Sequence, residues 1–80
     1  MEAGRIEESV TPMEYVVILE KGDSSYGAYV PDLPGCVAVG DTRDEAMELI
    51  REAIELHIES LRENGEAVPP PHSFVEKVAV

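Results

Sequence analysis

The sequence predicts a single small α+β domain in which a mixed sheet of four strands carries one helix on one face, with the elements in the order βββαβ. The strongest observation is the segment 42–64, whose apolar residues recur with helical spacing opposite a row of glutamates. Short β-branched and aromatic runs stand before and after this segment, as expected for strands. A chain of 80 residues buries only about 60% of its unfolded surface, which favours one core.

The chain opens with a polar segment, residues 1–12, that lacks apolar periodicity and ends in Thr11-Pro12. Such a segment cannot bury enough apolar surface to offset the entropy lost on ordering. We therefore expect residues 1–12 to be a disordered leader and residues 13–80 to form the domain.

Residues 15–19 form an unbroken apolar run and predict the first strand. The odd-numbered residues of this run would lie on one face of the sheet and the even-numbered residues on the other. Because a strand that is apolar on both faces is usually covered on both, this strand is expected at the centre of the sheet.

Two further strands are expected before the helix. Residues 26–30 follow a turn at residues 21–25 that contains Gly22, and they are expected to pair with the first strand as a hairpin. A third short run, residues 36–39, leads through Gly40 into the helix.

The helix has clear ends in the sequence. Thr42 and Glu45 predict a capping box, in which a hydroxyl and a carboxylate each accept a hydrogen bond from an amide at the helix start. Gly65 can take the left-handed conformation that closes the last turn, and the prolines at 69–71 prevent the helix from resuming. The residues expected to face the sheet are Ala46, Leu49, Ile50, Ala53, Ile54, His57 and Leu61.

Residues 73–80 predict the last strand, through Phe74, Val75, Val78 and Val80. A helix that returns the chain to its sheet normally makes a right-handed parallel connection, so this strand is expected beside the first. The predicted strand order is therefore 3-2-1-4.

The composition argues against several classes of function. Seventeen acidic and six basic residues give a formal charge of -11, which repels phosphates, so direct binding of nucleic acid is not expected. No apolar run reaches the roughly 20 residues of a membrane span and no secretory leader is recognisable, which predicts a cytoplasmic protein without a membrane partner. The same charge is compatible with solubility, with a basic protein partner, or with neither.

One helix covers only one face of such a sheet, so the other face is expected to be sealed by a second subunit or a partner. Met47, Leu56 and Ile58 widen the apolar arc of the helix beyond what one sheet requires. Tyr29, next to a proline corner, is expected either at an interface or in the core. We therefore expect a homo-oligomer, a dimer or a tetramer, with these four side chains as candidate interface residues.

No constellation in the sequence predicts catalysis, a cofactor or a metal site. A metal-dependent nuclease needs several carboxylates that converge on two ions, and the first predicted strand supplies none. Cys36 could act as a nucleophile with His57 or His72 as its base, but a small buried cysteine is the simpler interpretation. His57 falls within the apolar arc, which favours a neutral imidazole in the core or at a subunit contact over a metal ligand. His72, on a loop, is expected to be exposed and uninvolved.

Residues 29–36, with the sequence Tyr-Val-Pro-Asp-Leu-Pro-Gly-Cys, followed by residues 40–42 and 45–46, resemble the signature of the HicB-like antitoxin family. The similarity continues through residues 53–57 and 63–66, and it covers essentially everything from Met13 to the end of the chain. The resemblance implies a truncated ribonuclease H-like fold, and the paired prolines are expected to build a rigid corner before the third strand. The signature residues are Pro31, Asp32, Leu33, Pro34, Gly35, Cys36, Gly40, Thr42 and Glu45.

The resemblance also implies a function. Members of this family neutralise HicA-like toxins, which are small basic proteins that cleave messenger RNA, and the acidic composition suits such a partner. Many members carry a further C-terminal domain that binds operator DNA, whereas this chain, which ends at its last predicted strand, is not expected to bind DNA. The predicted function is thus a non-catalytic antitoxin domain. The alternatives are a solitary oligomeric binding module with another partner, and a vestigial enzyme.

Overall fold

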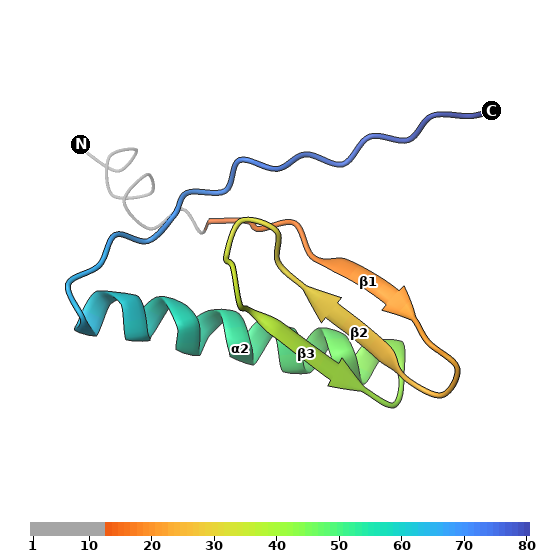
Figure 1. Ribbon diagram of the computed structural model, residues 1–80, viewed down its shortest axis with the longest axis horizontal. Helices are drawn as coiled ribbons and strands as arrows, with labels where there is room; N and C mark the ends of the chain where they lie inside the picture. Colours follow the sequence, from red (N-terminus) through yellow and green to blue (C-terminus); the bar gives the residue numbers. More distant parts are fainter. Residues whose placement is uncertain (1–12) are drawn as a thin grey trace, which may run out of the picture.

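The computed structural model describes residues 13–80, which contain a three-stranded sheet followed by one long helix (Figure 1). Strands β1 (Ile18–Lys21), β2 (Tyr26–Tyr29) and β3 (Val37–Gly40) form an antiparallel sheet in the order β1-β2-β3. Helix α2 (Arg43–Glu63) packs against one face of this sheet, mainly over β3 and β2. The α+β class is confirmed, while the expected leader lies outside the described residues.

The pairing of the strands determines which side chains meet the helix. Leu19 lies opposite Ala28 in the first ladder, and Ala28 lies opposite Ala38 in the second. All three belong to the core, where they pack with the buried Ala46 and Ile50 of α2. The small side chains of Ala28 and Ala38 let the helix pack closely on β2 and β3.

Two predictions about the sheet are wrong. Residues 73–80 form no strand, and the end of the chain runs away from the sheet as an extended segment (Figure 1). Consequently β1 lies at an edge and β2 is central, in contrast to the predicted order 3-2-1-4. An apolar pattern shows that a segment can form a strand, but pairing also requires that the segment reach an edge, and the chain beyond Ser73 diverges from β1. The pairing of β1 also begins later than predicted, at Ile18.

The helix begins and ends where the sequence predicts. Thr42 is the N-cap, and its Oγ1 accepts a hydrogen bond of 3.0 Å from the amide of Glu45. The carboxylate of Glu45 in turn accepts a hydrogen bond from the amide of Asp41, one residue before the cap. At the other end Gly65 has a φ of 71° and closes the last turn. Local chemistry is therefore sufficient to fix the length of this helix.

Contact between the helix and the core weakens along α2. In the first half, Ala46 and Ile50 are buried, although Leu49, which was expected to face the sheet, is 37% exposed. Ala53, Ile54, His57 and Leu61, which were also expected to face the sheet, are only half-buried. The second half of α2 extends past the ends of the strands, so much of its surface is open (Figure 1).

Gly40, at the end of β3, permits a close approach between the sheet and the helix. A Cβ atom on this residue would lie 2.7 Å from the backbone nitrogen of Ala46 and 3.1 Å from its Cα. Both are backbone atoms in the first turn of α2, so they cannot give way without a shift of the helix. Gly27 in the central strand differs, because nothing lies within 4 Å of the corresponding position.

Replacing Gly40 with alanine is expected to destabilise the domain by about 1 to 3 kcal/mol, because the added methyl group overpacks a backbone contact. The matched control, Gly27→Ala, is expected to stay within about 0.5 kcal/mol of the wild type, since its methyl group meets open space. Urea unfolding followed by circular dichroism measures both variants. Equal losses in the two variants would show that strand conformation, and not the contact with the helix, makes glycine necessary at this position.

Candidate protein-binding site

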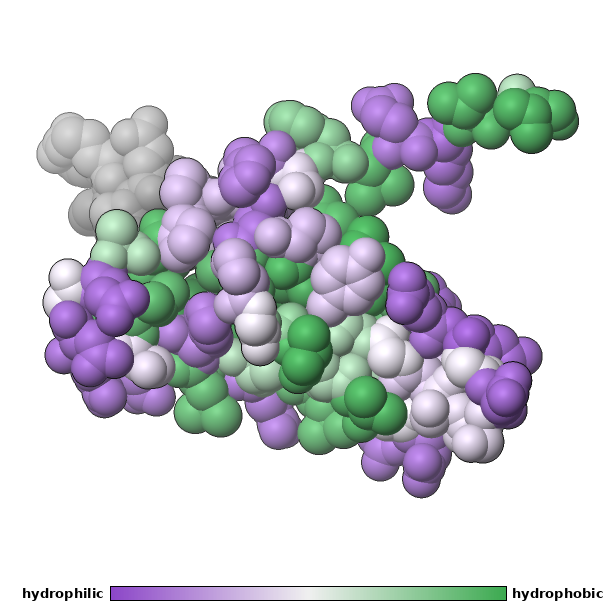
Figure 2. Space-filling view, in the orientation of Figure 1, coloured by the Kyte–Doolittle hydropathy of each residue, from purple (hydrophilic) through white to green (hydrophobic). Residues whose placement is uncertain are grey.

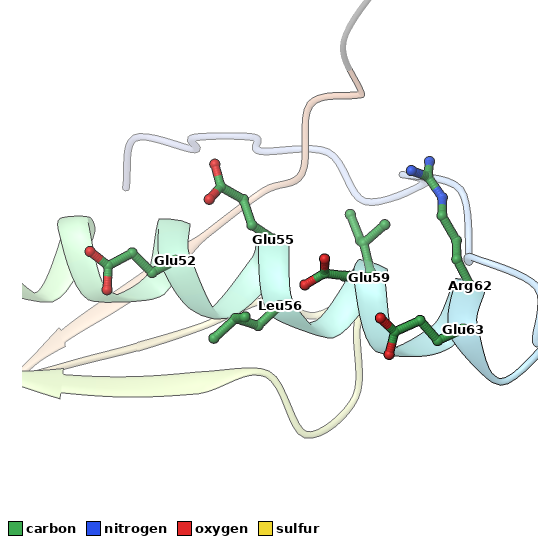
Figure 3. Close-up of a pocket in the computed structure, with 7 residues that line it drawn as sticks. Glu52, Glu55, Leu56, Glu59, Arg62 and Glu63 are labelled. Carbon is green, nitrogen blue, oxygen red and sulfur yellow. The ribbon is translucent and has the colours of Figure 1, made fainter.

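The second half of α2 presents a row of carboxylates. Glu52, Glu55, Glu59 and Glu63 follow one another at intervals of three or four residues, which places them along one side of the helix. Figure 3 shows their side chains projecting from successive turns. Within residues 13–80 no salt bridge neutralises these carboxylates, although Arg62 lies on the same turn as Glu63. This side of α2 is therefore strongly acidic.

Apolar side chains lie among these carboxylates. Leu56 and Ile58 line, with the four glutamates and Arg62, an open groove of about 780 Å³. Leu56 is 64% exposed and Ile58 is half-buried. Exposed apolar groups surrounded by charges are typical of a surface that binds another protein, because charge guides the encounter and apolar burial holds the complex. The groove brings together two of the four candidate interface residues.

A second groove lies between α2 and the segment that precedes β1. It has a volume of about 340 Å³, and apolar side chains predominate among the residues that line it, including Tyr15, Val17, Ile54 and Ile58. Met47, another candidate interface residue, lines this groove and packs against the core. Ile58 and Glu55 line both grooves, so the two grooves are adjacent.

The face of the sheet that is turned away from α2 is apolar and open. Val37 and Val39 are 64% and 66% exposed, and Tyr29, the fourth candidate interface residue, is 39% exposed. Ile18 of β1 lies opposite Tyr29, so the apolar surface extends across all three strands. Figure 2 shows apolar side chains gathered over the strands with hydrophilic groups around them. Sequence reasoning missed the two valines, although their alternation with the inward-facing residues of β3 was a usable signal.

The loop between β2 and β3 makes the predicted corner. Two turns in succession, closed by backbone hydrogen bonds of 3.1 and 3.0 Å, reverse the chain between the strands. Leu33 and Cys36 are buried beneath the loop, whereas Pro31 and Pro34 are exposed on it. Gly35 has a φ of 86°, which a residue with a side chain adopts only with strain. This stretch of the signature therefore shapes the backbone and fills the core.

Asp32 lies inside this corner, and its side chain is only 1% exposed. One carboxylate oxygen accepts hydrogen bonds from the amides of His72 and Ser73 at 2.8 and 2.9 Å, and the other accepts one from the hydroxyl of Ser73 at 2.6 Å. The Nε2 atom of His72 lies 3.2 Å from the second oxygen. Asp32 thus holds the chain beyond the helix against the β2–β3 loop. The side chain of His72 is 72% exposed, as expected, but the expectation that this residue is uninvolved is wrong.

These hydrogen bonds determine the charge of Asp32. The hydroxyl of Ser73 is the main group that lowers the pKa of the carboxyl, and the amides of His72 and Ser73 lower it further, against the opposing effect of burial. The carboxylate is therefore ionised at neutral pH, and its hydrogen bonds are charge-assisted. This cluster has little local signal in the sequence, because the partners lie 40 and 41 residues along the chain from Asp32.

A second contact fixes the proline connector, residues 69–71. The hydroxyl of Tyr15 donates a hydrogen bond of 2.6 Å to the carbonyl oxygen of Pro69. Burial, with a smaller effect from the charge of Asp32, raises the pKa of this hydroxyl, so the group stays protonated and remains a donor. The connector is held at both ends, because Tyr15 binds Pro69 at its start and Asp32 binds His72 and Ser73 just after its end.

The residues considered for nucleophilic chemistry do not form a site. Cys36 is buried, and burial raises the pKa of its thiol, which disfavours the reactive thiolate. No hydrogen bond between described residues links Cys36 to His57 or to His72. Across residues 13–80, no three histidine, cysteine or acidic side chains are grouped so that they could hold a metal ion. The same part of the chain has no helix of the length and apolarity needed to cross a membrane.

Known proteins resemble this chain in sequence and in fold. The family described as the HicB-like antitoxin of bacterial toxin–antitoxin systems matches residues 15–79. A UPF0150 protein of Synechocystis is 43% identical over 76 residues, which cover 90% of this chain and 96% of that protein. The crystal structure of the N-terminal domain of the Burkholderia pseudomallei antitoxin HicB aligns with a TM-score of 0.66 and 44% identity over 72% of this chain and 69% of that one. A chain of a HicA3 and HicB3 toxin–antitoxin complex aligns with a TM-score of 0.64 and 32% identity over 74% and 70% of the two chains.

Replacing Asp32 with asparagine is expected to destabilise the domain at neutral pH, because the amide has lost the charge and one of the two acceptor oxygens. The difference from the wild type should shrink in acid. The pKa of Asp32 is lower in the folded protein than its ordinary value of 3.8, so the contribution of the charge is complete above that value and is lost as the pH falls through the lower folded value. Denaturant unfolding over a series of pH values measures this difference.

Asp23→Asn, in the exposed turn between β1 and β2, is the matched control for the loss of one carboxylate. Amide hydrogen exchange of His72 and Ser73 reports the attachment directly, and it is expected to accelerate in Asp32→Asn but not in the control. A stability difference for Asp32→Asn that stays constant from neutral pH into strong acid would contradict a role for the charge.

Proposed function

Because the chain belongs to the HicB-like antitoxin family, we propose that it binds and neutralises a basic, messenger-RNA-cleaving toxin of the HicA kind. The likeness to a chain from a HicA3 and HicB3 toxin–antitoxin complex supports a toxin as the kind of partner. The observation on this chain that carries the proposal is the acidic groove of α2, where four carboxylates surround the exposed Leu56.

Charge complementarity favours a basic partner for this groove. The helix carries seven acidic and three basic residues, within a chain whose formal charge is -11. Carboxylates at successive positions on one helix face repel one another, and cationic groups of a partner relieve that repulsion. A toxin that cleaves RNA needs cationic groups to hold the phosphates of its substrate. An acidic helix bound to those groups would keep RNA from them, which is a direct means of neutralisation.

The proposed activity is binding without catalysis. Occupation of the toxin requires no reaction by this chain, no cofactor and no contact with nucleic acid, whose phosphates its acidic surface repels. We place this activity in the cytoplasm, where messenger RNA is available to the toxin. In this proposal the truncated ribonuclease H-like sheet and the signature residues serve as the scaffold that positions α2.

The proposal predicts a small basic reading frame of the HicA kind next to the gene, and the protein that it encodes is the partner for the test. Co-expression of the two proteins is expected to rescue growth that the basic protein alone arrests. The purified pair is expected to form a complex whose association rate falls between low and physiological salt, because salt screens the attraction between the charged surfaces. The dissociation rate depends on buried apolar contacts and is expected to change less.

Two double variants distinguish the groove from the overall charge. Glu55→Gln with Glu59→Gln removes two charges from the groove and is expected to slow association about three- to tenfold. The control, Asp23→Asn with Glu66→Gln, removes two charges from exposed positions outside α2 and is expected to slow association by less than about twofold. Equal slowing in both would assign the effect to net charge. Absence of any complex with the neighbouring protein would overturn toxin binding and favour a solitary binding module with another partner.

A further inference from the structure

The end of the chain, residues 74–80, leaves the domain as an extended apolar segment. Phe74, Val75 and Val78 are 86%, 64% and 81% exposed. None of the residues 74–80 makes a hydrogen bond to residues 13–73. Apolar groups in such a number on one extended segment indicate a surface that is covered in an assembly.

The outer edge of β1 has backbone amides and carbonyls with which this segment can form hydrogen bonds. In the described part of the chain β1 pairs only with β2, so the amides and carbonyls on its other edge have no strand partner. The end segment starts beside residues 14–16, which lead into β1, and then diverges from the strand (Figure 1). A shallow hollow marks the place where the two are adjacent, and the residues that line it are Glu14, Tyr15, Val16, Pro71, Ser73, Phe74 and Val75.

We propose that residues 74–80 of one copy pair with the outer edge of β1 in a second copy, which returns its own end segment to the first. The exchange is reciprocal and produces a two-fold symmetric dimer. Each sheet then gains the fourth strand that the apolar pattern of residues 73–80 predicts, but a different chain supplies it.

The attachment at Asp32 explains why the partner is a second copy and not the same chain. Both the amide and the hydroxyl of Ser73 are bonded to Asp32, which fixes the direction in which the chain leaves the domain. Pairing with its own β1 would require the segment to bend back directly after this residue. The proline connector, residues 69–71, precedes this point and is held by Tyr15 and Asp32, so it cannot redirect the segment. A segment that points away from its own sheet is instead placed to meet the edge of a neighbouring copy.

The charge of the two segments also fits a second copy better than a basic protein. Residues 74–80 contain one acid and one base, Glu76 and Lys77, and β1 ends in the equally balanced pair Glu20 and Lys21. Association therefore rests on backbone hydrogen bonds and apolar burial, against the mutual repulsion of two chains of charge -11. Salt screens this repulsion, so it is expected to strengthen the dimer. Binding of a basic toxin has the opposite dependence on salt, which keeps the two proposals distinguishable.

Sedimentation of the full chain is the first test. A dimer is expected, and the double variant Val75→Pro with Val78→Pro is expected to raise its dissociation constant at least about tenfold. The backbone amides of residues 75 and 78 point to opposite edges of an extended strand. In either register, one of the two prolines therefore removes an amide that would bond to β1. The control, Val75→Ile with Val78→Ile, keeps β-branched side chains and is expected to stay within about twofold. A monomer, or a dimer that the prolines leave unchanged, would overturn the proposal.

A disulfide crosslink separates exchange between chains from closure within one chain. A parallel pairing with the alignment that Phe74 and Tyr15 have in the hollow places Lys77 beside Ile18, and this is the register that the crosslink tests. Chains with Ile18→Cys are mixed with chains with Lys77→Cys and oxidised, while the native Cys36 is buried and does not compete. Exchange predicts a linked pair that contains one chain of each kind. If a chain with both new cysteines instead closes on itself and the mixture yields no linked pair, the exchange is wrong.

Discussion

The close contact between the end of β3 and the first turn of α2 determines how the rest of the domain is used. Gly40 has no side chain, so the backbone of Ala46 can lie against it, and the helix is held over β3 and β2. With its start fixed there, a helix of 21 residues is too long for strands of four residues. Its second half therefore projects beyond the sheet, and Leu56 and the surrounding carboxylates remain exposed. The acidic groove is a consequence of this mismatch in length.

A buried charge organises the other end of the chain. A carboxylate that is removed from water is tolerated only when hydrogen bonds replace those of the solvent, and Asp32 receives them from His72 and Ser73. The corner between β2 and β3 holds this carboxylate in place, so the signature residues of the loop act on a segment that follows the helix. Tyr15 adds a further contact to Pro69. The path of the chain after α2 is thus set by polar contacts, in contrast to the apolar contacts that hold α2 itself.

The parts of the structure that could be predicted from the sequence depend on local chemistry. The ends of α2 follow from Thr42 and Gly65, and the exposure of Leu56 follows from its position beyond the inward stripe of the helix. The prediction of a last strand is wrong because an apolar pattern indicates only that a segment can pair. The local sequence does not indicate which strand edge, or which chain, the segment would pair with. The role of Asp32 escaped prediction for the same reason, since its partners are distant in sequence. The sequence pattern does not reveal contacts between residues far apart in the chain, whether these are polar side-chain contacts or the pairing of strands.

The proposed surfaces solve a problem that the composition creates. Two chains of charge -11 repel each other, and the repulsion is greatest where carboxylates are concentrated, as they are on the second half of α2. Copies can therefore associate most readily where acids and bases balance, which is the case for β1 and for residues 74–80. An assembly made there leaves the acidic groove free, because neither segment lines it. Segregation of charge along the chain thus lets the same small domain join its own copies at one surface and remain available to a basic partner at another.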